Sequence, residues 1–171
     1  PENELSRDMG VDMNPVTSGP RVNESLETNI EGVFACGNVL HVHDLVDFVS
    51  EEAGNAGRNA ALYIHNNGEE EIPEEIKITL SPKNGVRYTV PSEIRIGHMA
   101  EEQLVRFRVG NVYKNCYIRA YLDGERIFSR KKQVAAPGEM EQIKLKKEQL
   151  LSILEGKQKQ DKHELVIQVE E

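Results

Sequence analysis

The chain has 171 residues, of which 38% are hydrophobic and 29% charged, enough for a packed core but only for one or two small domains. Its net charge of -8 argues against a nucleic-acid partner, which would need a basic face. Because no run of about 18 residues is apolar, no membrane span is expected. Cys36 and Cys116 form no CxxC pair, which indicates reduced thiols in a cytoplasmic protein.

The composition changes after Asn66-Asn67-Gly68, from a stretch rich in glycine and alanine to short runs that alternate apolar and polar residues. These three residues favour a helix stop, and the acidic, proline-containing run after them is typical of a linker. The sequence therefore predicts a first domain, an acidic linker and a second domain, at residues 1–68, 69–75 and 76–171.

The first domain is expected to contain a short buried strand, Gly32–Gly37, followed by a helix. Asp44 is the expected N-cap of that helix, and Asp47 adds negative charge to its first turn. Apolar residues then recur at spacings of three and four, which predicts one buried helix face. The residues of this face are Val46, Val49, Ala53, Ala56, Ala60 and Ile64.

The second domain is predicted to be an all-β sandwich of the immunoglobulin-like kind, because several short strand patterns follow one another. The turn Asp123-Gly124 separates two of them as a tight hairpin. A short helix is expected at Lys147–Leu154, before the last strand. The predicted strands are Ile76–Leu80, Tyr88–Val90, Leu104–Val109, Cys116–Leu122, Arg126–Val134, Met140–Leu145 and Glu164–Val169.

A motif in the first domain consists of Thr28-Asn29-Ile30-Glu31-Gly32-Val33-Phe34-Ala35-Cys36-Gly37-Asn38-Val39, followed by Ala53-Gly54-x-x-Gly57-x-x-Ala60-Ala61. It resembles the last FAD-contacting segment of the pyridine nucleotide-disulfide oxidoreductase family. There, a strand T-x-x-x-G-[VI]-[FY]-A-x-G-D precedes a helix ending in G-x-x-A-A. The resemblance covers roughly residues 1 to 65 and implies that the first domain is the C-terminal remnant of an α/β FAD-binding domain.

The resemblance implies four cofactor-binding residues: Gly37, Asn38, Val46 and Asp47. Gly37 would let the backbone approach the flat cofactor, because it has no Cβ. Asn38 stands where the family has an acid and can still accept a hydrogen bond from a ribityl or ribose hydroxyl, without a charge. Val46 and Asp47 would lie in the first turn of a helix whose positive N-terminal end faces the flavin pyrimidine. In the alternative interpretation, Asn38 only turns the chain after a strand.

His41 and His43 offer two imidazoles after the predicted strand, a pattern that can bind a metal ion. The other histidines, His65, His98 and His163, stand in no recognisable ligand spacing with this pair. We therefore expect no metal site, and the resemblance instead implies that His41 and His43 help to line a flavin pocket.

No G-x-G-x-x-G spacing is present, so neither the FAD pyrophosphate loop nor the NAD(P) loop of the family is expected in these residues. The chain begins with Pro1, as a fragment could. We therefore predict the C-terminal part of an FAD-dependent, NAD(P)H-linked oxidoreductase, not catalytic alone. Its expected partners are the remainder of that flavoprotein, a second copy or another subunit. The alternative hypothesis is a non-catalytic protein–protein interaction module.

Overall fold

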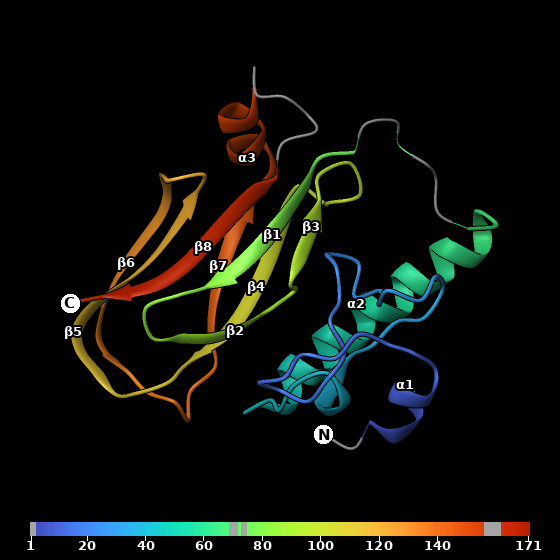
Figure 1. The fold of residues 1–171 in the computed structure, drawn as a ribbon, viewed down its shortest axis with the longest axis horizontal. Helices are drawn as coiled ribbons and strands as arrows, with labels where there is room; N and C mark the ends of the chain where they lie inside the picture. The colour runs from blue at the N-terminus through green and yellow to red at the C-terminus, as the bar shows by residue number, and fades with distance from the viewer. Residues whose placement is uncertain (1–2, 69–71, 73–74, 156–161) are drawn as a thin grey trace. The chain divides into compact units, whose positions relative to one another are not determined.

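The computed structural model describes residues 3–68, 72, 75–155 and 162–171. It divides into two compact units, Pro1–Pro73 and Glu74–Glu171 (Figure 1), which are described separately. Most of the predicted linker at 69–75 lies outside the described residues. Within the described residues, no helix is both long enough and apolar enough to cross a membrane.

The Glu74–Glu171 unit consists of two β-sheets around one hydrophobic core (Figure 1). The larger sheet has the order β3 (Glu93–Arg95), β1 (Lys77–Pro82), β8 (His163–Glu170), β5 (Tyr113–Leu122) and β6 (Glu125–Ala135). The smaller sheet has the order β2 (Val86–Val90), β4 (Glu102–Val109) and β7 (Glu141–Lys146). Neighbouring strands are antiparallel except β1 and β8, which are parallel.

These two sheets confirm a predominantly β, sandwich-like second domain. Each of the seven predicted strands is present with slightly shifted ends, and helix α3 spans Lys147–Leu154 as expected. Strand β3, Glu93–Arg95, was not predicted, because three residues are too short to display an alternating pattern. The immunoglobulin-like assignment within this class stays a prediction.

The core of this unit follows from the period of two along its strands. In β5, Cys116 to Leu122 alternate between buried and half-buried positions, as one face of a sheet requires. Phe107 of β4 is fully buried and belongs to the same core as Ile118 of β5. Helix α3 adds Leu150 to this core, so it packs as part of the sandwich.

A buried carboxylate links the two sheets of the sandwich. The Glu141 side chain on β7 is only 2% exposed, and its oxygens accept hydrogen bonds from Arg130 and Lys132 on β6. Arg106 on β4 is a further basic residue that is buried. Because β6 and β7 belong to different sheets, the ion pairs connect them at their edges.

The Pro1–Pro73 unit contains helix α1 (Glu4–Asp8), the short 3-10 helix η1 (Gly37–Val39) and helix α2 (Val46–His65). The predicted strand Gly32–Gly37 is wrong, because this segment makes only an isolated bridge between Phe34 and Glu27. Its two end glycines have φ values of +75° and +68°, so the backbone turns at both ends and leaves too few extended residues for a ladder.

Helix α2 is present, but its N-cap and buried face differ from the prediction. Leu45 is the N-cap, one residue after Asp44, and no side chain caps the helix. Val46 and Ile64, predicted to be buried, are 78% and 74% exposed. The most buried residue of α2 is Glu52, at 1% exposure, because the helix turns a carboxylate inward to meet polar partners. A pattern of apolar residues alone could not reveal this orientation.

The Asp123-Gly124 hairpin between β5 and β6 is confirmed, with φ values of +50° and +86°. We predict that Gly124→Ala lowers the free energy of unfolding by about 1 kcal/mol, because an L side chain is strained in the left-handed region. A Cβ at Gly124 would meet no atom within 4 Å, so the effect reports backbone strain alone. Urea unfolding measures it.

The matched control is Gly138→Ala, where a Cβ also meets nothing within 4 Å and φ lies outside the left-handed region. This control should leave stability unchanged or raise it slightly. Equal unfolding free energies for the two variants would contradict the prediction.

Candidate functional site

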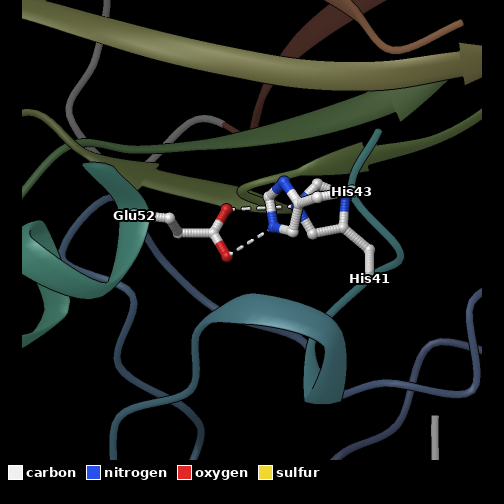
Figure 2. Close-up of side chains that lie close together, drawn as sticks. All are labelled: His41, His43 and Glu52. Carbon is white, nitrogen blue, oxygen red and sulfur yellow. Dashed lines mark hydrogen bonds and ion pairs between the residues drawn. The ribbon is translucent and has the colours of Figure 1, made fainter. Parts of the chain in front are cut away.

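His41, His43 and Glu52 form a polar cluster within the described part of the Pro1–Pro73 unit (Figure 2). Nε2 of His41 lies 3.1 Å from one Glu52 oxygen, and Nε2 of His43 lies 3.0 Å from the other. The backbone N–H of Gly37 donates to the oxygen that also faces His43, at 2.7 Å. One carboxylate therefore holds η1, the following loop and α2 together.

Local sequence explains why these side chains converge. Glu52 shares a helix face with Phe48 and Ala56, four residues before and after it, and that face is turned inward. In the loop, Val42 is 55% exposed while the side chains on either side of it, His41 and His43, are buried. This alternation directs both imidazoles toward the helix and Val42 toward solvent.

The cluster is almost completely removed from solvent. The side chains of His41, His43 and Glu52 are 0%, 1% and 2% exposed, respectively. Burial by itself would raise the pKa of the Glu52 carboxyl, but the hydrogen bond and charge of His41, the charge of His43 and the Gly37 N–H bring the pKa below its ordinary value. Glu52 is therefore an ionised carboxylate at neutral pH.

Cys36, which precedes Gly37, is a half-buried free thiol. Burial and, to a smaller extent, the charge of Glu52 raise the pKa of this thiol. The raised pKa favours the neutral thiol over the nucleophilic thiolate.

The structure distributes the four predicted cofactor residues over two neighbouring elements. Gly37 is buried at the start of η1, whereas Asn38, Val46 and Asp47 are exposed. Helix η1 contacts α2, and a Cβ on Gly37 would lie 3.5 Å from Cγ1 of Val49. The Asn38 side-chain oxygen accepts a hydrogen bond from the His43 N–H at 3.2 Å, so Asn38 helps to turn the loop and still presents an exposed amide.

Sequence reasoning missed Glu52, which lies eleven residues after His41 and nine after His43. The expectation of no metal site rested on the spacing of the histidines alone, and Glu52 is an acidic residue. The sequence nevertheless contained a signal for the inward position of Glu52. Glu52 lies four residues before Ala56, a residue of the predicted buried helix face, and residues four apart share a helix face. His98 pairs with Glu75 and His163 pairs with Asp123, in both cases within the Glu74–Glu171 unit. No protein-family model, curated protein or solved structure matches the chain.

We predict that Glu52→Ala lowers the free energy of unfolding of the Pro1–Pro73 unit by about 3–5 kcal/mol, because it removes the buried partner of two imidazoles and one amide. Hydrogen exchange read by mass spectrometry should show loss of protection in η1 and α2. The matched control is Glu51→Ala, since Glu51 is the exposed neighbour on the same helix and should cost less than about 0.5 kcal/mol. Similar exchange in the two variants would contradict a structural role for Glu52.

Proposed function

We propose that the Pro1–Pro73 unit is the flavin-facing end of the FAD domain of an NAD(P)H-linked oxidoreductase. One observation carries the proposal: the turn that begins at Gly37 packs against helix α2 beside the exposed first turn of that helix. A flavin would supply the hydride and electron transfer chemistry, while the residues of this unit would bind and orient it.

The turn fits a ribityl-binding role. Gly37 has a φ of +68°, a conformation that side-chain-bearing residues rarely adopt, so the backbone can reverse here without strain. Asn38 follows immediately, and its exposed side chain carries an oxygen that can accept a hydrogen bond from a hydroxyl group. The hydrogen bond from His43 N–H fixes the direction of that side chain. An acid at this position would bind a hydroxyl more strongly, because charge-assisted hydrogen bonds are stronger.

The beginning of α2 supplies the second half of the site. No side-chain hydrogen bond caps the helix at Leu45, so the backbone N–H groups of Val46 and Asp47 can serve an external acceptor. A flavin accumulates negative charge on its pyrimidine edge when it is reduced, and the positive end of a helix stabilises such charge. These two N–H groups would therefore favour the reduced cofactor.

Apolar side chains around this turn fit the flat isoalloxazine ring. Val39, Val42, Leu45 and Val46 are 38%, 55%, 56% and 78% exposed, respectively. Apolar residues are costly in contact with water, and a flat aromatic ligand would cover such a surface. A predominantly apolar lining with a few polar groups is the usual composition of a cofactor site.

The remaining parts of the reaction lie outside this site. The pyrophosphate loops that would bind FAD and NAD(P) are not encoded in these 171 residues, so the chain alone would bind flavin weakly and would not turn over a substrate. The Glu74–Glu171 sandwich would serve contacts with the rest of the protein or with another subunit. A coding sequence that carries two G-x-G-x-x-G loops ahead of Pro1 would support this assignment.

We predict that riboflavin, which has the ribityl chain but no diphosphate, binds the isotope-labelled chain with a Kd on the order of 1 mM. Amide NMR shifts should be confined to Gly37, Asn38, Val46, Asp47 and their neighbours. Asn38→Asp should tighten binding by about fivefold, because it converts the hydroxyl contact into a charge-assisted hydrogen bond. The control Asn66→Asp, at the exposed C-terminal end of α2, should leave binding unchanged.

Shifts that cluster elsewhere, or no shifts when riboflavin is titrated up to its solubility limit, would contradict the flavin proposal. Equal effects of Asn38→Asp and Asn66→Asp would show that the added charge acts through the net charge of the chain and not through a ribityl contact.

A further inference from the structure

We propose that His41, His43 and Glu52 form a structural site for one divalent transition-metal ion of the Zn²⁺ type. This inference stands independently of the flavin proposal, because it concerns the buried side of the loop that follows η1. It also departs from the expectation of no metal, which rested on the lack of a third ligand among the histidines.

The donor set suits such an ion. Two imidazole nitrogens and one carboxylate are ligands that Zn²⁺ commonly takes, leaving one position of a tetrahedron for water. The three residues can each offer one donor atom such that all donors lie within 4.8 Å of one another. Harder cations such as Mg²⁺ and Ca²⁺ prefer oxygen ligands, so the two imidazoles favour a transition metal.

The distances are close to those of a loaded site. With metal–ligand bonds of about 2.1 Å, neighbouring donors of a tetrahedron lie about 3.4 Å apart. The two nitrogen–oxygen distances, each to a different oxygen of Glu52, are 3.1 and 3.0 Å, and the three donor atoms lie within 4.8 Å of one another, so the side chains would adjust around an ion without leaving the cluster. The two imidazole rings are inclined by 64° to one another with centroids 4.3 Å apart. They therefore meet edge to face and are not stacked in parallel. Figure 2 shows both rings beside the carboxylate.

Burial makes a cation favourable at this point. The Glu52 carboxylate, whose side chain is 2% exposed, has lost most of its hydration and lies against both imidazoles and the Gly37 N–H. A divalent ion bound here would place positive charge directly on this carboxylate. Binding requires each neutral ring to carry its proton on Nδ1, which leaves Nε2 as the ligand atom.

The ligands also define what the ion would do. His41 and His43 come from the loop after η1, whereas Glu52 comes from the second turn of α2. An ion bound to all three would cross-link loop and helix and stabilise the folded unit over the unfolded chain. The near-complete burial of the three side chains favours this structural role over a catalytic one.

The test uses the complete 171-residue chain after treatment with a chelator. Titration with Zn²⁺ alone, followed by calorimetry, should give one ion per chain. Saturating Zn²⁺ should raise the Tm of the Pro1–Pro73 unit by on the order of 10 °C. X-ray absorption at the zinc edge of the wild-type protein should show imidazole scattering from two ligands and nitrogen or oxygen atoms at about 2.0–2.1 Å.

His43→Gln and Glu52→Gln should each weaken Zn²⁺ binding by more than about 100-fold, since even an outer-sphere partner contributes about 10- to 100-fold. The control His65→Gln removes an exposed imidazole at the end of α2 and should leave the affinity unchanged. The proposal is overturned if the wild-type chain binds no Zn²⁺, if folded His43→Gln binds as tightly as wild type, or if the absorption spectrum lacks the two imidazoles. The spectrum decides the matter even where a variant fails to fold.

Discussion

The Pro1–Pro73 unit depends on one buried carboxylate. Glu52 binds the Gly37 N–H and both imidazoles of the following loop, so three segments of the chain share a single anchor. This unit has few buried apolar side chains on its long helix, and several of its large apolar residues are exposed. Polar contacts to Glu52 thus position the loop in a way that hydrophobic packing of α2 alone could not.

The second unit uses a similar device in a different setting. Glu141 is as buried as Glu52 and is held by Arg130 and Lys132 from the opposite sheet. In the second unit, the Glu141 carboxylate is paired with an arginine and a lysine beside a large apolar core. The two sheets are already held together by the burial of that core, and the ion pairs add a further link between them. In the first unit, the partners are imidazoles whose ring nitrogens can accept a metal ion or donate a proton. Only this second chemistry makes a buried carboxylate a candidate site.

The extent to which the sequence predicted the structure depended on how each segment is stabilised. The strands of the sandwich were foreseeable because half-buried strands impose a period of two, and the Asp123-Gly124 turn has its own backbone signature. The segment Gly32–Gly37 is apolar enough for a strand, but the positive φ values of its end glycines belong to turns, and composition does not distinguish the two. Glu52 was missed because the apolar pattern of a helix excludes charged residues from its inner face by assumption.

The buried and exposed sides of the turn at Gly37 carry different chemistry. On the inner side, the Gly37 N–H is engaged by Glu52, and on the outer side Asn38 and the uncapped beginning of α2 are accessible. The Asn38 oxygen also accepts the N–H of His43, whose imidazole contacts Glu52. A change in the Glu52 cluster that displaces the His43 backbone would therefore alter the hydrogen bond that orients Asn38. A rigid inner cluster would hold the outer groups in place before a ligand arrives, which lowers the entropy that binding must otherwise overcome.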